Sequence, residues 1–141
     1  MTDSQKKCMI VEMPLQVNGY DIDVMGIVSN IVYIRWFEDL RFKFLDTYFP
    51  FEKIISHNQS PILATTEASY KYPLTIYDKP FGRVWVIGMS RAKWKMEFEI
   101  VTENKIHCTG RQSGYFFDLN KNKPIAIPSE LINRFKLESE I

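Results

Sequence analysis

The stretch YDIDVMGIVSNIVYIRWFEDLRFKFLDTY, residues 20–48, contains a polar turn followed by an apolar helix. Two aspartates and Gly26 make its first part typical of a turn. Apolar and aromatic residues then recur at intervals of three or four: Tyr33, Phe37, Leu40, Phe44 and Tyr48. Such spacing places them on one helical face. We therefore predict one long helix over residues 28–48, which Pro50 ends.

Alternating apolar and polar residues predict strands on both sides of this helix. One alternation runs from residue 9 to 17, and Pro14 within it indicates an edge strand or a bulge. Four predicted strands follow the helix, over residues 62–72, 83–89, 93–102 and 105–118. Gly110 and Gly114 indicate a bend or bulge in the last of these. Ser129 has the character of an N-cap for a short C-terminal helix.

The order of one strand, one long helix and four strands predicts an α+β fold. An antiparallel five-stranded sheet would wrap around the single long helix, with residues 1–141 forming one domain. One helix covers the apolar face of five strands poorly. We therefore expect a partner subunit, in a homodimer or a homotetramer.

The composition excludes several classes of function. The formal net charge is +1, from 18 basic and 17 acidic side chains, so we expect neither a nucleic acid nor a membrane partner. No apolar run is long enough to span a bilayer, and the first residues lack the apolar region of a secretory signal. Cys8 and Cys108 lie too far apart to form a metal-binding pair. We expect a cytoplasmic protein without metal or cofactor.

Two carboxylates stand just before the predicted helix. A helix N-terminus offers free backbone N–H groups and a partial positive charge, which suit a developing oxyanion. Asp21 or Asp23 could act on a carbonyl bound there, although turn formation or capping is the alternative role for both. A calcium loop is excluded because Met25 and Val32 occupy positions that need oxygen ligands.

The run D-x-D-x-x-G-I-V, followed by Tyr33, Arg35, Trp36 and Glu38, resembles the signature of the 4-hydroxybenzoyl-CoA thioesterase family and related acyl-CoA thioesterases. The resemblance implies the hotdog fold and runs thinly to about Phe135. It also implies that Asp23 is catalytic, that Gly26 belongs to the oxyanion turn, and that the backbone N–H of Asn30 is the oxyanion donor. The implied substrate is an acyl-CoA ester.

A second resemblance keeps the carrier of the acyl group open. The pattern V-S-N-x-x-Y, which begins at Val28, resembles the V-N-N-x-x-Y of acyl-ACP thioesterases, which share the hotdog fold. Their additional catalytic asparagine and histidine would fall on Met25 and Ile27, so only the aspartate carries over. An acyl-ACP thioesterase and a non-catalytic module that binds acyl thioesters therefore stand as alternatives.

Asp23 could work in either of two ways. An ordinary aspartate has a pKa of about 3.9, so it is ionised at neutral pH and can attack the thioester or orient a water molecule. The leaving thiol, with a pKa of about 8.5, needs little acid assistance. The Asn30 amide either lies near the reacting atoms or bonds its own backbone.

Residues that could bind the substrate are more dispersed. Arg91 and Lys93 could contact the phosphates of coenzyme A, or they could belong to a solvated strand face. Tyr33 is core or pocket wall, and Thr65 and Thr66 could line the acyl pocket by analogy with the family.

We assign structural roles to the other polar candidates. Glu38 and Arg41 are expected to form a solvated pair one helical turn apart. His57 is expected in a loop and His107 on a strand, neither at metal-ligand spacing. Cys108 lacks an activating neighbour and is not expected to be a nucleophile.

Overall fold

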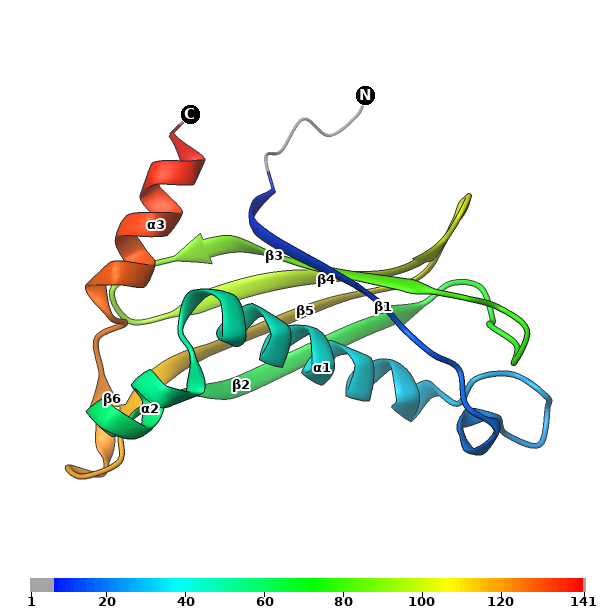
Figure 1. The fold of residues 1–141 in the computed structure, drawn as a ribbon, viewed down its shortest axis with the longest axis horizontal. Coiled ribbons are helices and arrows are strands. Elements are labelled where there is room, and N and C mark those ends of the chain that lie inside the picture. Colours follow the sequence, from blue (N-terminus) through cyan, green and yellow to red (C-terminus); the bar gives the residue numbers. More distant parts are fainter. Residues whose placement is uncertain (1–6, 141) are drawn as a thin grey trace.

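The computed structural model describes residues 7–140 and shows one long helix lying along a twisted antiparallel sheet (Figure 1). The long strands have the spatial order β1-β3-β4-β5-β2, and a short β6 pairs with β5. The strands are β1 (Cys8–Pro14), β2 (Gln59–Tyr70), β3 (Phe81–Met89), β4 (Trp94–Thr102), β5 (Lys105–Asp118) and β6 (Lys123–Ile125). The helices are the 3-10 turn η1 (Gly19–Asp21), α1 (Asn30–Tyr48), α2 (Phe51–His57) and α3 (Ser129–Ser139).

This architecture confirms the predicted hotdog fold, with local corrections. The sheet gains a sixth, three-residue strand, β6. Pro50 does not lead into a loop: it is the N-cap of α2, and His57 is the last residue of that helix. Proline fits there because its fixed φ suits the start of a helix and no N–H bond is lost. Pro128, and not Ser129, occupies the N-cap position of α3.

The long helix α1 begins at Asn30, two residues later than predicted. Val28 is still extended because it forms an isolated antiparallel bridge with Ile22, and its N–H donates to the carbonyl oxygen of Leu74 at 2.9 Å. The bonds of Val28 thus hold the segment before α1 to the loop after β2. They decide where the helix can start.

The buried face of α1 lies directly on the sheet. Phe37 and Leu40 are fully buried, and the Phe37 ring lies 4.7 Å from that of Phe98 on β4, centroid to centroid. A Cβ on Gly110 would lie 2.4 Å from the Phe37 ring, so this position on β5 must lack a side chain. Gly110 is therefore a site of close approach, not the predicted bend.

Gly114 marks a second close approach. A Cβ there would lie 1.9 Å from the carbonyl oxygen of Ile62 and 2.4 Å from the Trp94 ring. The nearby irregularity lies in the neighbouring strand, where the register of β2 shifts between Leu63 and Thr65. The bulge predicted from Gly114 is thus found on the partner strand.

The two edges of the sheet differ. β1 is an edge strand, as Pro14 predicts, and its register shifts between Cys8 and Val11. Within that irregularity Met9 has φ of 55°, and its N–H donates to Oε1 of Glu138 on α3 at 2.7 Å. At the other edge the twelve-residue β2 pairs only with β5 among the described residues. β2 is thus the long open edge.

No helix within residues 7–140 is long and apolar enough to cross a membrane.

Replacement of Gly114 by alanine should destabilise the fold by about 3 kcal/mol or more, because the new methyl group meets backbone and an indole ring. Gly19→Ala is the matched control, since nothing lies within 4 Å of a Cβ there. Its effect should stay within about 0.5 kcal/mol. Urea unfolding of both variants measures the difference. Equal stabilities would contradict the close approach at Gly114.

Candidate functional site

Asp21 has a structural role in the turn before α1. It is 6% exposed, and its Oδ2 accepts hydrogen bonds from the backbone N–H and the side-chain amide of Asn18, at 2.8 and 3.4 Å. Its carbonyl oxygen accepts from the N–H of Ser29 at 2.9 Å. Asp21 therefore closes η1 onto the start of the helix, which matches the capping role considered for it.

Asp23 is the exposed carboxylate of the pair. Its Oδ1 accepts from the backbone N–H of Met25 at 2.8 Å and of Ile27 at 3.5 Å. Gly26, with φ of 79°, adopts a left-handed conformation that favours glycine and donates its N–H to the Asp23 carbonyl oxygen at 3.0 Å. No described residue donates to Oδ2. The carboxylate is therefore oriented through one oxygen and presents the other to solvent.

The N-terminus of α1 offers unoccupied donors. Its N-cap residue, Ser29, makes no side-chain capping bond. Within residues 7–140, no group accepts from the backbone N–H of Asn30 or of Ile31. Both residues are exposed. These N–H groups and the positive end of the helix dipole can stabilise an anion.

The other predicted site residues are spread over the fold. Tyr33 is 2% exposed, and its ring meets those of Trp36 and Tyr70 edge to face, each at 5.4 Å. The exposed residues Thr65 and Thr66 lie on β2 and form hydrogen bonds to Ser113 and Gln112 of β5.

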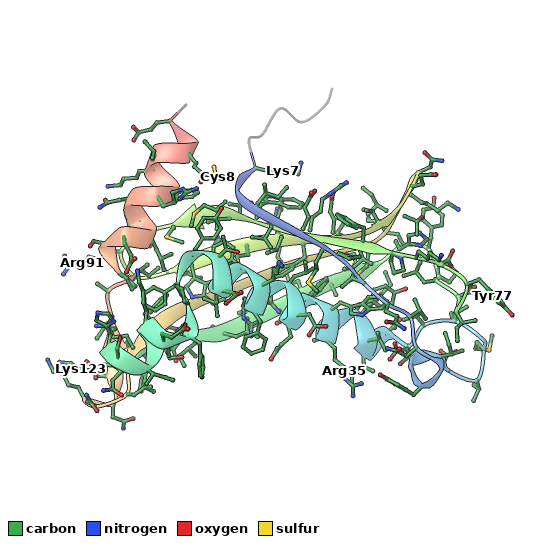
Figure 2. All side chains as sticks on the ribbon, in the orientation of Figure 1. Lys7, Cys8, Arg35, Tyr77, Arg91 and Lys123 are labelled. Atoms are coloured by element: carbon green, nitrogen blue, oxygen red, sulfur yellow. The ribbon has the colours of Figure 1, made fainter. Side chains whose placement is uncertain are left out.

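The basic pair lies far from the aspartate within one chain. Arg91 and Lys93 are exposed in the turn between β3 and β4. Figure 2 places Arg91 beside α3, at the end of the molecule opposite Tyr77, and Figure 1 shows that the loop before α1 lies at the Tyr77 end. A single chain therefore does not bring these basic residues to Asp23.

Contacts from the segment after β2 to the helix start were not predicted. The Tyr70 hydroxyl donates to the carbonyl oxygen of Asn30 at 3.3 Å, and the Leu74 carbonyl accepts from Val28. His107, 5% exposed, anchors this segment through the Tyr72 carbonyl oxygen, 3.1 Å from its Nδ1. No local pattern in this segment reveals its long-range partners.

Arg41 is held more tightly than a surface ion pair. The predicted contact with Glu38 is present at 3.4 Å, but the Arg41 side chain is only 15% exposed. Its Nη1 also donates to Oε1 of the buried Gln112 at 2.7 Å. The expectation of a fully solvated pair is thus wrong, because this guanidinium reaches the sheet.

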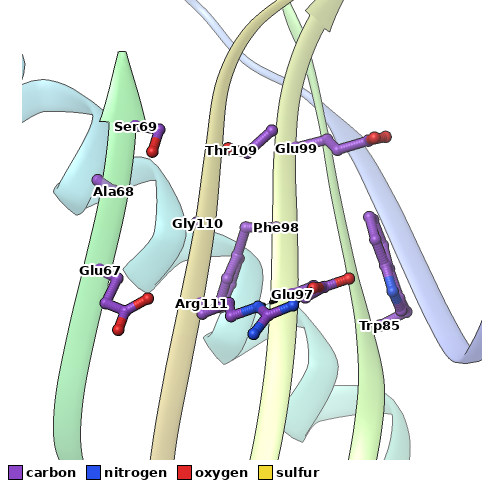
Figure 3. Close-up of a pocket in the computed structure, with 10 residues that line it drawn as sticks. All are labelled: Glu67, Ala68, Ser69, Trp85, Glu97, Phe98, Glu99, Thr109, Gly110 and Arg111. Carbon is purple, nitrogen blue, oxygen red and sulfur yellow. Dashed lines mark hydrogen bonds and ion pairs between the residues drawn. The ribbon is translucent and has the colours of Figure 1, made fainter.

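Two hollows of the molecule are each lined by more carboxylates than cations. One, of about 320 Å³, lies on the sheet face away from α1, where Glu67 and Glu97 flank Arg111 and Glu99 lies further along β4 (Figure 3). The other, of about 570 Å³, lies beside the first half of α1, and its lining includes Asp21, Glu38, Asp39 and Arg35. This balance of charge disfavours a phosphate-bearing ligand in either hollow. Ile31 lines the second hollow, but neither Asp23 nor Asn30 does.

Two buried groups are excluded as nucleophiles at neutral pH. Burial raises the pKa of the Cys108 thiol to about 12, so the thiolate is scarce. Burial, and then the nearby Cys108, raise the pKa of Tyr33 to about 12. Within residues 7–140, no group of three His, Cys, Asp or Glu side chains could hold a metal ion.

The chain is similar to known proteins in sequence and in fold. The family model described as thioesterase-like superfamily matches residues 17–135. An acyl-acyl carrier protein thioesterase of Arabidopsis thaliana is 26% identical over 130 residues, which cover 88% of this chain and 66% of that protein.

Solved structures show the same fold at low identity. A hypothetical protein of Staphylococcus aureus in complex with CoA superposes with a TM-score of 0.87 at 11% identity, covering 99% of this chain and 89% of that one. A DHNA-CoA thioesterase from Staphylococcus aureus gives 0.81 at 18% identity, covering 91% and 89%.

The two raised pKa values predict a loss of stability at high pH. Cys108 and Tyr33 rise from ordinary values of 9.0 and 10.0 to about 12, so between pH 9 and 12 the folded chain keeps protons that the unfolded chain releases. The free energy of unfolding should therefore fall as the pH rises through this window. Tyr33→Phe should flatten the part above pH 10, and the 90% exposed Tyr77, changed to Phe, should not. Urea unfolding across the window tests this, and a flat wild-type profile would contradict it.

Proposed function

Because this chain belongs to the thioesterase-like superfamily, we propose that it hydrolyses acyl-CoA thioesters to a free acid and coenzyme A. One observation carries the assignment of the site. The exposed Asp23 carboxylate is oriented by its own turn, in the loop that leads directly to the unoccupied N–H groups of α1. A carboxylate and an oxyanion site at one helix end are the two parts that thioester hydrolysis requires.

In the proposed reaction the thioester carbonyl lies at the start of α1. Asp23 either attacks its carbon, giving a mixed anhydride that water then cleaves, or directs water at the same carbon. The Asn30 N–H stabilises the negative charge that develops on the carbonyl oxygen; one such donor contributes about 3 kcal/mol. The thiolate leaves without an acid, and water supplies the oxygen of the product acid.

A second copy of the chain would complete the coenzyme site. Of the two Staphylococcus aureus neighbours, one is in complex with CoA and the other is a DHNA-CoA thioesterase, which supports this carrier. In one chain Arg91 lies at the opposite end from Asp23. An antiparallel two-fold pairing reverses the partner, and so brings the partner's Arg91 and Lys93 to the Asp23 end.

The open edge of β2 is the surface we propose for that pairing. The other edge, β1, is interrupted by its register shift and by the bond from Met9 to Glu138. β2 offers twelve residues of unprotected strand, with Leu63 36% exposed on it. Exposed strands of this length favour pairing with another strand.

Acyl-ACP hydrolysis is the second candidate. It is favoured by the 26% identity to the Arabidopsis thaliana acyl-acyl carrier protein thioesterase, which covers 88% of the present chain. The chemistry at Asp23 would be the same. Only the surface that receives the carrier would differ.

Asp23→Asn should lower kcat for thiol release at least about a hundred-fold, equivalent to ~3 kcal/mol of transition-state stabilisation. The measurement uses acyl-CoA esters from acetyl to palmitoyl, with benzoyl and phenylacetyl, beside the matching acyl-ACP esters. Asp46→Asn, at an exposed position in the last turn of α1, is the control and should keep wild-type activity. If the wild type releases thiol from acyl-ACP esters but not from acyl-CoA esters, acyl-ACP hydrolysis is established. Equal rates for wild type and Asp23→Asn would exclude Asp23 as the catalytic carboxylate.

Leu63→Lys should shift the protein from a dimer to the 16.6 kDa monomer, because the ammonium group enters the proposed seam. Ile106→Lys is matched in exposure, at 40% against 36%, and lies on β5 at the β4–β5 turn. It should leave the mass unchanged. Light scattering after gel filtration measures both. A wild-type monomer, or a Leu63→Lys dimer, would rule out pairing through β2.

A further inference from the structure

Tyr70, the last residue of β2, contacts Asn30, the first residue of α1, through its side chain. Its hydroxyl donates to the carbonyl oxygen of Asn30 at 3.3 Å, forty residues away in the chain. The ring is 44% exposed and packs edge to face on Tyr33. Burial and the nearby Cys108 raise the pKa of Tyr70, so the hydroxyl keeps its proton and remains a donor at neutral pH.

The Tyr70 hydroxyl binds the peptide group between Asn30 and Ile31, whose N–H has no acceptor among the described residues. The Asn30 carbonyl and the Ile31 N–H belong to one planar peptide unit, so holding the oxygen also orients the N–H. No described residue accepts from that N–H. A hydrogen bond at the carbonyl oxygen also polarises the unit and strengthens the N–H as a donor.

The geometry points to Tyr70 as a positioning residue of the oxyanion site, which it equips with a second donor, the N–H of Ile31. This inference rests on the proposed thioesterase function and deepens it. The tetrahedral oxyanion would receive two N–H groups, from Asn30 and Ile31, with Tyr70 orienting the second. Tyr70 itself contacts neither substrate nor reacting atoms.

The sheet holds Tyr70 rigidly enough for this role. Its backbone pairs with Cys108 on β5, and the next residue, Lys71, donates its N–H to the His107 carbonyl oxygen at 2.8 Å. His107 is buried and bonds the Thr102 hydroxyl through Nε2 at 2.7 Å. The backbone of Tyr70 is therefore fixed relative to the sheet, and the contact of its ring with Tyr33 orients the hydroxyl. The peptide that it holds is fixed in turn.

A purely structural tie between β2 and α1 is the competing explanation. That tie would affect the folded fraction and substrate binding without a specific effect on the chemical step. An oxyanion donor acts on charge that develops only in the transition state, so its loss lowers kcat and leaves KM unchanged. The two explanations thus differ in a measurable way.

Tyr70→Phe tests the inference because phenylalanine keeps the ring contact with Tyr33 and removes only the hydroxyl. We expect kcat to fall about three- to ten-fold, as for one lost hydrogen bond, with KM and the urea midpoint unchanged. The amide ¹⁵N resonance of Ile31 should shift in the free protein. Tyr72→Phe is the control: Tyr72 is 52% exposed in the same segment, and its ring lies under Lys105. It should alter neither kcat nor that resonance.

Several results would overturn the inference. Unchanged kcat in Tyr70→Phe, with Asp23→Asn inactive, would remove the role of Tyr70 and leave the proposed function standing. A fall in kcat that follows a loss of folded protein, or a rise in KM alone, would assign Tyr70 a structural role. A wild type that turns over neither CoA nor ACP esters would remove both proposals together.

Discussion

The contact between the Phe37 ring and the backbone at Gly110 sets the separation of helix and sheet, and the site depends on it. The ring rests where β5 has no side chain, and it stacks at 4.7 Å on Phe98. Close-packed interiors do not deform continuously, so this contact, together with that of Leu40 against Gly82, restricts the height and axial position of α1. The N-terminus of α1 is then placed relative to the end of β2. The bonds from Tyr70 to Asn30, at 3.3 Å, and from Val28 to Leu74, at 2.9 Å, depend on that placement.

Local patterns predicted the fold because each element follows a regular period. The spacing from Tyr33 to Tyr48 requires a helix, and the alternation around Phe98 requires a strand. The end of α1 at Tyr48 agrees with the prediction, but α2 was missed because proline can both end one helix and cap another, and only the geometry at Pro50 decides. The start was misjudged because Val28 bonds Leu74, a contact between distant residues. Such contacts leave no periodic signal.

The candidate site was predictable in part for the same reason. The D-x-D pair and the glycine after it identified the loop; residue types alone left two equivalent carboxylates, and only the family resemblance selected Asp23. Tertiary structure separates them. Asp21 is buried and its Oδ2 is satisfied by Asn18, whereas Asp23 is exposed with one oxygen unoccupied by any described residue. A buried carboxylate that closes a turn cannot also reach a substrate, so burial removes Asp21 as a candidate and leaves Asp23 as the carboxylate that we propose.

Assembly and chemistry are connected through β2 in this scheme. The strand that we propose as the seam between two copies ends at Tyr70, whose hydroxyl holds the first peptide of α1. Pairing along β2 would limit fraying of the strand end, because edge strands without partners open most easily. The peptide that carries the Ile31 N–H would then be held more firmly in the dimer than in the monomer. The same pairing would bring the partner's Arg91 and Lys93 to the Asp23 end. One surface would therefore support both the oxyanion donors and the contacts to coenzyme A.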